Sequence, residues 1–209
     1  MKKPEWFGKY PVMPIINQVL PEESLMIAEA LLVGGVEIME ITLRSDKAKE
    51  SLVAVRKNFP EIVLGAGSVL NPEQLEWIRG EGLDFAVAPG WSDECWQKAN
   101  TLNLNFIPGI LTPSELIKAI DAGCLNPKIF PVEPVGGISY VKSLLAPFRA
   151  IGLQCLPTGG ILKEQVPEYL NDPQVAMVGG SWLTPPELIK AKDISAITKL
   201  AKCSLLFAN

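Results

Sequence analysis

Apolar residues follow two alternating patterns along the chain. Short runs rich in β-branched residues predict strands, and longer segments with an apolar residue at every third or fourth position predict amphipathic helices. The predicted strands cover residues 12–16, 36–42, 62–66, 85–88, 105–107, 128–132, 152–156 and 175–178. Helix-like segments follow them, for example residues 22–33, 46–57, 72–79 and 113–122. A capping or turn residue precedes each segment, so the pattern predicts a repeated strand–helix succession.

About eight strand–helix units in succession predict an α/β fold of the TIM (β/α)8 barrel type. An open doubly wound sheet gives a similar pattern, and it stays the alternative fold. No low-complexity linker divides the chain, which predicts a single barrel domain over residues 1–209. Residues 2–8 are predicted to form a short N-terminal helix across the bottom of the barrel. In such a barrel, functional residues gather where the strands end.

Length and charge restrict the classes of partner. The chain has 209 residues, of which 48% are hydrophobic, and this suits one domain with a sizeable core. Its 19 basic and 23 acidic residues are spread along the chain, so no basic patch attracts nucleic acid. No apolar stretch approaches the roughly 20 residues of a membrane span, and residues 1–9 lack the apolar core of a signal peptide. We therefore expect a soluble protein that is not exported.

Cysteine and histidine usage points to a compartment and limits the chemistry. The four cysteines are scattered without a paired spacing, which predicts a reducing cytoplasm. With 0 histidines, the chain lacks the commonest metal ligand and the base of His-dependent catalytic triads. We therefore expect no metal and no cofactor, and we expect acid–base chemistry from carboxylate, lysine, hydroxyl or water.

Three polar residues share one face of the strand predicted over residues 36–42 and its exit. Side chains alternate along a strand, so Glu40, Thr42 and Arg44 point together, away from Met39 and Ile41. Burying an acid and a base is unfavourable unless they are paired or used by a ligand. The three residues therefore indicate a site inside the barrel or at its mouth, or else a structural Glu–Arg pair.

Lys128 is the only lysine inside a predicted strand. Partial desolvation favours the neutral amine, and a neutral amine attacks a ketone carbonyl. This residue alone fits equally well a strand-end lysine that extends to water. Its interpretation therefore depends on the residues around it.

Two glycine pairs follow the last two predicted strands, Gly159-Gly160 and Gly179-Gly180. Backbone N–H groups at these places often bind phosphate, because glycine lets the anion approach closely, and Ser181 adds a hydroxyl donor. A single glycine pair is more often an ordinary turn. Two pairs at these two positions predict an anion site.

Further residues follow earlier strands at the same end of the predicted barrel. Residues 65–68 form a predicted tight turn that lines the mouth with Ser68, and Pro89 ends another strand. Trp91 either forms a wall of the pocket or packs on the surface. Cys155 is interpreted as a small core residue rather than a nucleophile, since no histidine is present to activate it.

These residues belong to motifs that extend through nearly the whole chain. The motifs are Gly34-Gly35-Val36, Glu40-Ile41-Thr42-Leu43-Arg44, Gly65-Ala66-Gly67-Ser68-Val69-Leu70-Asn71-Pro72, Ala88-Pro89-Gly90, Ile107-Pro108-Gly109-Ile110, Lys128-Ile129-Phe130-Pro131, Pro157-Thr158-Gly159-Gly160-Ile161 and Gly179-Gly180-Ser181-Trp182. Through them the chain resembles the 2-dehydro-3-deoxy-phosphogluconate aldolases, which often also act as 4-hydroxy-2-oxoglutarate aldolases. The resemblance implies a homotrimeric barrel, a Schiff-base lysine at Lys128 and an acid–base glutamate at Glu40.

The resemblance also implies roles for the substrate-binding residues. Arg44 would bind the substrate carboxylate, and the two glycine pairs with Ser181 would bind phosphate. Thr158 and Ser68 are interpreted as hydrogen-bonding groups around the carboxylate and imine, and Pro89 as a further substrate contact. Ser68 stands where the family commonly has threonine, which keeps the hydroxyl group.

The expected activity is therefore a class I aldolase reaction on a small, phosphorylated 2-oxo acid, with pyruvate as one product. The expected substrate is 2-dehydro-3-deoxy-6-phosphogluconate, and 4-hydroxy-2-oxoglutarate is a second one. The alternatives are a 2-dehydro-3-deoxy-6-phosphogalactonate aldolase and a non-catalytic barrel that binds a phosphate ligand. The non-catalytic alternative would leave the burial of Glu40, Arg44 and Lys128 unexplained. A metal-dependent aldolase is disfavoured by the missing histidines.

Overall fold

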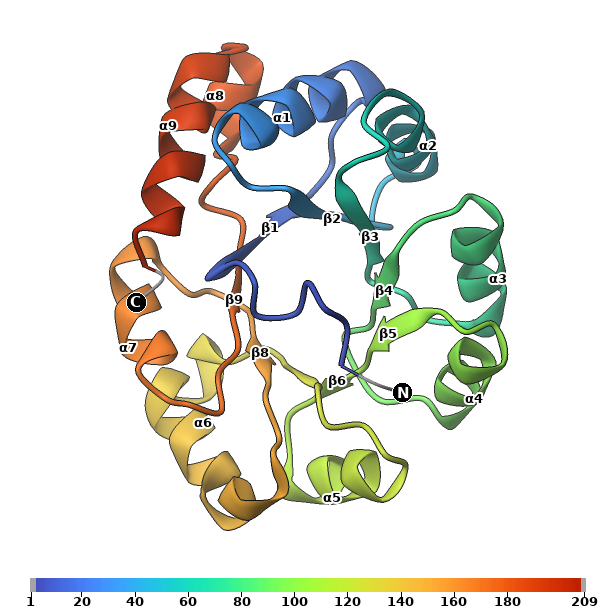
Figure 1. The fold of residues 1–209 in the computed structure, drawn as a ribbon, viewed down its shortest axis with the longest axis vertical. Coiled ribbons are helices and arrows are strands. Elements are labelled where there is room, and N and C mark those ends of the chain that lie inside the picture. The colour runs from blue at the N-terminus through green and yellow to red at the C-terminus, as the bar shows by residue number, and fades with distance from the viewer. Residues whose placement is uncertain (1–2, 208–209) are drawn as a thin grey trace.

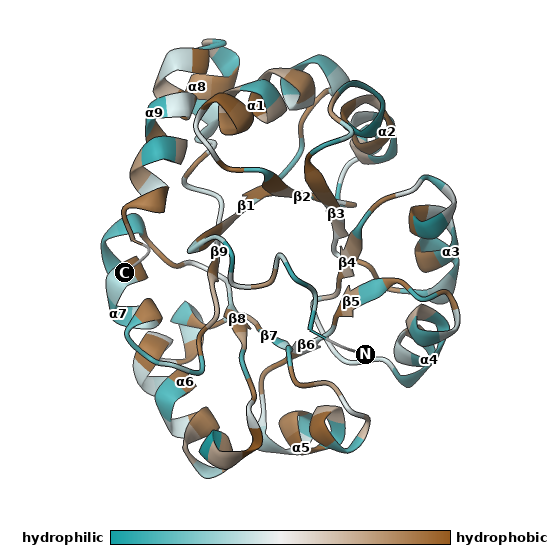
Figure 2. Cartoon of the chain, in the orientation of Figure 1, coloured by the Kyte–Doolittle hydropathy of each residue, from teal (hydrophilic) through white to brown (hydrophobic). Residues whose placement is uncertain are grey.

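The computed structural model describes residues 3–207, and these form nine strands joined only by parallel ladders. The strands are β1 (Val12–Ile16), β2 (Ile38–Thr42), β3 (Val63–Gly67), β4 (Phe85–Val87), β5 (Asn105–Ile107), β6 (Gly109–Ile110), β7 (Lys128–Ile129), β8 (Leu156–Pro157) and β9 (Val178–Gly180). They lie in the middle of the molecule and the helices surround them (Figure 1). The strands are mostly apolar in Figure 2, as burial on both faces requires.

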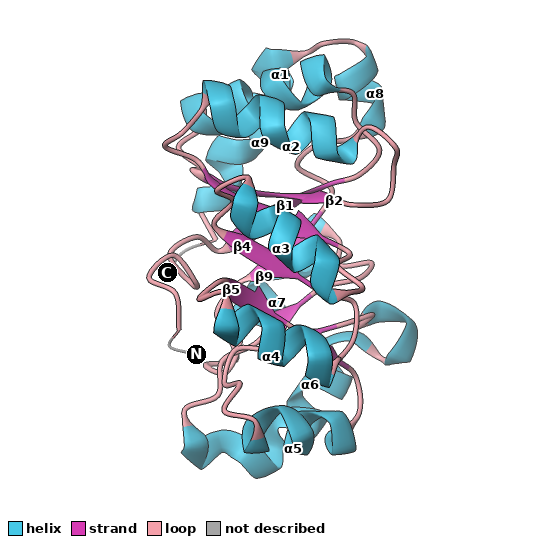
Figure 3. Cartoon of the chain, turned by 90° about the vertical axis from the view of Figure 1, so that its right-hand side faces the viewer, coloured by secondary structure: helices cyan, strands magenta, loops and turns pink. Residues whose placement is uncertain are grey.

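The helices alternate with the strands along the sequence. They are α1 (Pro21–Val33), α2 (Ala48–Asn58), α3 (Pro72–Gly80), α4 (Asp93–Thr101), α5 (Pro113–Asp121), α6 (Gly137–Leu145), α7 (Val166–Leu170), α8 (Pro186–Lys190) and α9 (Ile194–Leu205), with 3-10 turns η1 (Glu133–Val135), η2 (Ala146–Ile151) and η3 (Lys163–Gln165). In the view of Figure 3, strands lie between helices above and below. None of the helices within residues 3–207 has the length and apolar character to cross a membrane.

Capping residues fix where several helices begin. The Asn71 side chain accepts a hydrogen bond from the Gln74 N–H at 3.0 Å, and Pro72 starts α3. Thr112 and Glu115 form a reciprocal capping box at the start of α5. Each of these helices begins directly after the loop that leaves a strand, so the caps help to define the carboxyl-end loops where a ligand can bind.

The predicted closed eight-stranded (β/α)8 barrel is wrong. Residues 3–207 contain a six-stranded sheet in the order β5-β4-β3-β2-β1-β9 and a separate three-stranded sheet in the order β6-β7-β8. Pro108 lies between β5 and β6 and has no N–H for a ladder hydrogen bond, and the two strands that flank it belong to different sheets. Between β8 and β9 there are only isolated bridges, Cys155 with Val175 and Thr158 with Gly179.

The segment before β1 covers the end of the sheet where strands begin. The rings of Trp6 and Phe85 lie 4.5 Å apart between centroids, and Phe85 is the first residue of β4. The predicted helix over residues 2–8 is not formed in its described part, where two turns are closed by the N–H groups of Phe7 and Lys9. Gly8 has a φ of 86°, which ends any helical path, and residue 2 lies outside the described residues.

Candidate active site

A cavity of about 540 Å³ opens where strands β1, β2, β7, β8 and β9 end. This is the end of a parallel sheet at which ligands usually bind. Most of the residues predicted from the sequence line it, namely Glu40, Arg44, Lys128, Thr158, Gly159, Gly160, Gly179, Gly180 and Ser181. The structure therefore gathers residues from four distant parts of the chain around one space.

Ser68 and Pro89 are the predicted site residues that do not line this cavity. Ser68 still contacts the site, because its Oγ accepts a hydrogen bond from Arg44 Nε at 2.6 Å. Pro89 instead packs against the backbone of Gly109, where an added Cβ would lie 2.3 Å from the Pro89 carbonyl carbon. Ser68 is therefore placed to orient Arg44, whereas Pro89 packs on Gly109 and does not line the cavity.

Glu40 and Lys128 are the two buried ionisable groups of the cavity. Glu40, in the middle of β2, is 1% exposed, and Lys128, at the start of β7, is 4% exposed. Burial raises the pKa of Glu40, although the positive charges of Lys128 and Arg44 oppose this. Burial also lowers the pKa of Lys128, with Glu40 opposing and Arg44 adding to the shift. Both groups are therefore shifted toward their neutral forms, in which the amine is a nucleophile and the acid can give a proton.

Some buried polar atoms in the cavity can still form hydrogen bonds with a ligand. Within residues 3–207, neither carboxylate oxygen of Glu40 has a hydrogen-bond partner, and neither does Thr158 Oγ1. An added Cβ at Gly67 would lie 1.7 Å from Glu40 Oε1, so only glycine leaves room for this carboxylate. A buried carboxylate without partners is unfavourable for folding, which is typical of a group used by a ligand.

The two structural alternatives for the charged residues are not observed. The ion pairs among residues 3–207 do not include Glu40, and Arg44 donates instead to Ser68. Lys128 does not extend into water, because its side chain lies under the protein surface. Glu40, Thr42 and Arg44 all line the cavity, as their common strand face predicts.

The glycine pairs have structural reasons of their own. Gly159 and Gly160 have φ values of 103° and 89°, a region that other residues rarely adopt. An added Cβ at Gly179 would lie 2.4 Å from Thr158 Cγ2, and one at Gly180 would lie 2.5 Å from Trp182 Nε1. The glycines thus serve the backbone path and the close packing, and in addition they border the cavity.

Some cavity residues were missed from the sequence. The Phe130 ring lies under Lys128, with 4.8 Å between Nζ and the ring centroid. The two-residue spacing between Lys128 and Phe130 could have revealed it, since alternate residues share a face. Asn17 also lines the cavity, and its Oδ1 accepts a hydrogen bond from Thr42 Oγ1 at 2.8 Å. Trp182 lines it as well, but neither residue had a pattern that marked it beforehand.

Two residues that the sequence left open lie away from the cavity lining. Trp91 packs against Trp96 with 5.4 Å between ring centroids and donates to Asp93, so it follows the packing alternative. Cys155 is fully buried, and burial raises the pKa of its thiol, which agrees with a core residue. In the described part of the chain, no three Cys, Asp or Glu side chains cluster as metal ligands would.

Comparison with known proteins shows the family of the chain. The family model described as KDPG and KHG aldolase matches residues 5–200. A KHG/KDPG aldolase of Escherichia coli (strain K12) is 38% identical over 192 residues, which is 92% of this chain and 89% of that protein.

Solved structures give the same result. A KDPG aldolase from Legionella pneumophila, solved with pyruvate captured as a covalent carbinolamine intermediate, has a TM-score of 0.91 and 36% identity, covering 95% of this chain and 96% of that one. The 2-keto-3-deoxy-6-phosphogluconate aldolase of Zymomonas mobilis ZM4, solved with 3-phosphoglycerate, has a TM-score of 0.89 and 34% identity, covering 96% and 93%.

The fold, the site and these matches define a carbon–carbon lyase of the aldolase class. More narrowly, the chain belongs to the KDPG and KHG aldolase family.

Proposed function

We propose that this chain cleaves 2-dehydro-3-deoxy-6-phosphogluconate to pyruvate and glyceraldehyde 3-phosphate through a Schiff base on Lys128. The observation that carries the proposal is the burial of Lys128 and Glu40 in one cavity, with the pKa of each shifted toward its neutral form. A lowered pKa leaves more of the lysine amine neutral and able to attack a ketone, and a raised pKa lets a carboxyl group both give and take protons.

The first half of the proposed reaction forms and uses the imine. Lys128 Nζ attacks the C2 carbonyl carbon, and the neutral Glu40 carboxyl group gives the proton with which the oxygen leaves as water, so a protonated imine and the Glu40 carboxylate remain. The Glu40 carboxylate accepts the proton of the C4 hydroxyl. The electron pair of the C3–C4 bond then moves toward the imine nitrogen, which leaves an enamine on Lys128 and releases the C4 carbon as an aldehyde.

The second half restores the enzyme. The enamine takes a proton at C3, which Glu40 supplies, and becomes the imine of pyruvate. Water attacks this imine, the Glu40 carboxylate takes the proton that is released, and pyruvate leaves with the free amine of Lys128 restored. The centroid of the Phe130 ring lies 4.8 Å from Nζ, so the negative face of the ring stabilises the positive imine nitrogen.

The remaining residues hold the two ends of the substrate. Arg44 presents a planar guanidinium to the substrate carboxylate and is oriented by Ser68. Thr158 offers a buried hydroxyl without a partner among the described residues. The glycine pairs and Ser181 border the same cavity and are proposed to bind the phosphate.

The same chemistry extends to 4-hydroxy-2-oxoglutarate, which gives pyruvate and glyoxylate. A 2-dehydro-3-deoxy-6-phosphogalactonate substrate differs in the configuration of the cleaved carbon, and it stays the alternative. The non-catalytic alternative is disfavoured, because it gives no reason for a buried Glu40 without partners.

Borohydride trapping tests the proposal. The protein is incubated with pyruvate and sodium borohydride, and mass spectrometry then locates the reduced adduct. We expect the adduct on Lys128 and turnover that survives EDTA, because the imine supplies the electron sink that a metal would otherwise provide. An adduct on another lysine would overturn the assignment, as would activity that needs an added divalent metal.

Three further expectations belong to the same proposal. We propose one domain, a homotrimer in solution and a location in the cytoplasm. The buried cysteines Cys95, Cys124 and Cys155 are unpaired, which suits a reducing compartment. Sedimentation analysis would test the trimer, and a stable monomer with full activity would contradict it.

A further inference from the structure

The segment of residues 159–162 forms one wall of the cavity, and all four residues border it. It starts with Gly159 and Gly160, which adopt positive φ values and, without a Cβ, restrict the backbone less than other residues do. A wall that binds a phosphate through backbone N–H groups must hold those groups in place before the ligand arrives. Some neighbouring group must therefore fix this segment.

Glu133, in the 3-10 turn η1, makes the contacts that fix it. Its backbone N–H donates to the Gly159 carbonyl oxygen at 3.1 Å. Its carboxylate accepts hydrogen bonds from Tyr169 OH at 2.5 Å and from Gln165 Nε2 at 3.0 Å. Gln165 Oε1 in turn accepts from the Leu162 N–H at 2.7 Å. Both ends of the segment are thus connected to Glu133: the Gly159 end to its backbone N–H, and the Leu162 end to its carboxylate through Gln165.

Close packing reinforces these hydrogen bonds. An added Cβ at Gly160 would lie 3.0 Å from Glu133 Cβ, so the segment rests directly on this residue. Tyr169, on α7, is fully buried and anchors the carboxylate to the core. Burial and the hydrogen bond to Glu133 raise the pKa of Tyr169, so its hydroxyl stays a donor. Glu133 itself does not line the cavity.

We propose that Glu133 is a positioning residue that holds the segment 159–162 in the shape that binds the phosphate of the substrate. The inference rests on the proposed function, because it assigns the phosphate to this wall. It does not place Glu133 in contact with substrate. Its effect should therefore appear in phosphate recognition and not in the imine chemistry of Lys128.

The test compares Glu133→Ala with Glu133→Gln and with Gln165→Glu. The glutamine variant keeps one acceptor for the two donors, so we expect partial rescue. Gln165→Glu keeps the acceptor for the Leu162 N–H but places a carboxylate against Glu133 in place of a donor. The matched control is Glu164→Ala, since Glu164 is an exposed glutamate next to Gln165 in η3.

Three quantities are measured for each variant: KM and kcat on the phosphorylated and the non-phosphorylated substrate, inhibition by inorganic phosphate, and pyruvate trapping at Lys128. For Glu133→Ala we expect KM for the phosphorylated substrate and the inhibition constant of phosphate to rise about tenfold, the effect of one charge-assisted hydrogen bond. The kcat and KM for 4-hydroxy-2-oxoglutarate and the amount of pyruvate adduct trapped on Lys128 should stay near those of the unaltered protein.

Equal losses on both substrates, or unchanged phosphate inhibition, would overturn the inference. Failure of the proposed function is recognised separately, because the unaltered protein would then give no adduct on Lys128. If Glu133→Ala does not fold, which circular dichroism detects, the decision passes to Gln165→Glu. In that variant unchanged phosphate inhibition would equally contradict the positioning role.

Discussion

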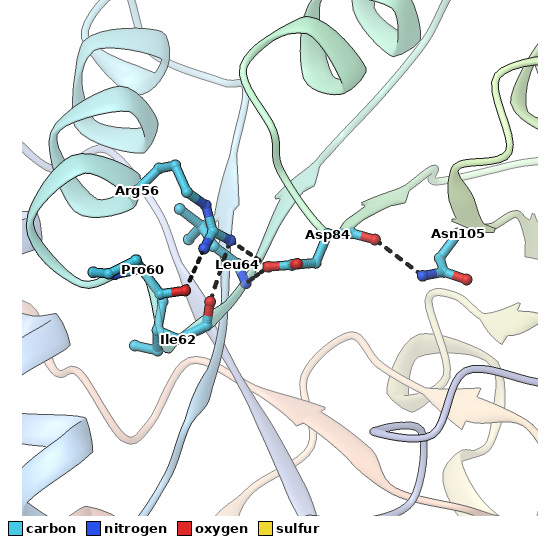
Figure 4. Close-up of polar contacts among 6 residues, drawn as sticks. All are labelled: Arg56, Pro60, Ile62, Leu64, Asp84 and Asn105. Carbon is cyan, nitrogen blue, oxygen red and sulfur yellow. Dashed lines mark hydrogen bonds and ion pairs between the residues drawn. The ribbon is translucent and has the colours of Figure 1, made fainter.

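Two regions of the molecule that each combine an acid and a base differ in how many hydrogen bonds their charged groups make. At the end where β3, β4 and β5 begin, Arg56 donates to Asp84 and to the carbonyl oxygens of Pro60 and Ile62 (Figure 4). The Asp84 carboxylate also accepts from the Leu64 N–H at 2.8 Å, so both charged groups have several partners. At the opposite end, the oxygens of Glu40 have none among residues 3–207.

The difference separates a structural cluster from a reactive one. The side chains of Arg56 and Asp84 are 19% and 40% exposed, so water also solvates these two charges. Their bonds join the α2–β3 loop to β3 and β4, and the Asp84 carbonyl oxygen reaches β5 through Asn105 Nδ2 at 3.1 Å. Glu40 and Lys128 are buried, and neither makes such bonds within residues 3–207, which reduces stability and leaves both groups available to a substrate.

Replacement of Lys128 should have the largest effect. We expect Lys128→Ala to lose the borohydride adduct and to lower kcat/KM by more than about a thousandfold, because the covalent route disappears. The Tm should not fall, since the change removes a buried amine without hydrogen bonds. Steady-state kinetics and thermal melting check both parts. Lys118→Ala, on the exposed face of α5, is the control. If Lys128→Ala turned over substrate as fast as the unaltered protein, the Glu40–Lys128 region would not be the reactive one.

Glu40→Gln should have the next largest effect. Glutamine keeps the size of the side chain but cannot accept the C4 hydroxyl proton, so we expect kcat to fall by about 10² to 10⁴. The adduct with pyruvate should still form on Lys128, because imine formation needs the amine. Rapid-quench kinetics and mass spectrometry separate the two steps. Turnover near that of the unaltered protein would make water or another group the base.

Asp84→Asn should change stability and leave activity intact. Asparagine removes the charge and one acceptor from the Arg56 cluster, and the partial exposure of this pair reduces the effect to about 1–2 kcal/mol. Urea unfolding measures the difference, and KM and kcat should match those of the unaltered protein. The exposed Lys47–Glu50 pair gives the control, because Glu50→Gln should leave the unfolding free energy unchanged. A loss of activity at constant stability would show that the two regions are coupled.

The sequence was sufficient for the regular elements of the first half of the chain. The predicted strands over residues 12–16 and 105–107 are β1 and β5 with the same bounds, and α3 extends the prediction by one residue. Alternating side chains also placed Glu40, Thr42 and Arg44 on one cavity face. These features depend on local periodicity and caps, which the sequence carries directly.

The second half was harder to predict because tertiary contacts decide it. The expected strand over residues 152–156 is observed as β8 at Leu156–Pro157, and the strand over 175–178 as β9 at Val178–Gly180. Prolines and glycines shorten these strands, and pairing depends on partners far along the chain. Asn17 and Trp182 entered the cavity for the same reason, because only the fold brings their loops to Lys128.

The smallest expected effect is a shift in the pH dependence of imine formation, and its direction differs between two variants. Lys128 reacts as the neutral amine, so trapping increases as the pH rises through its pKa. Burial lowers that pKa most, Glu40 raises it while ionised, and Arg44 lowers it. Glu40→Gln removes the raising charge, so the trapping profile should move to lower pH.

Arg44→Met removes the lowering charge, so the Lys128 pKa should rise and the profile should move to higher pH. Arg44→Lys keeps a positive charge and should leave the profile near its original place. Trapping is measured at saturating pyruvate. Weaker binding of the pyruvate carboxylate then leaves the midpoint of the profile unchanged, because it alters only how much adduct forms at a given pyruvate concentration. Midpoints that stay in place in both variants would mean that burial alone sets the pKa of Lys128, and midpoints that move in the same direction would contradict the opposing effects of Glu40 and Arg44. Opposite shifts would show that the charges of Glu40 and Arg44 both act on Lys128 across the cavity.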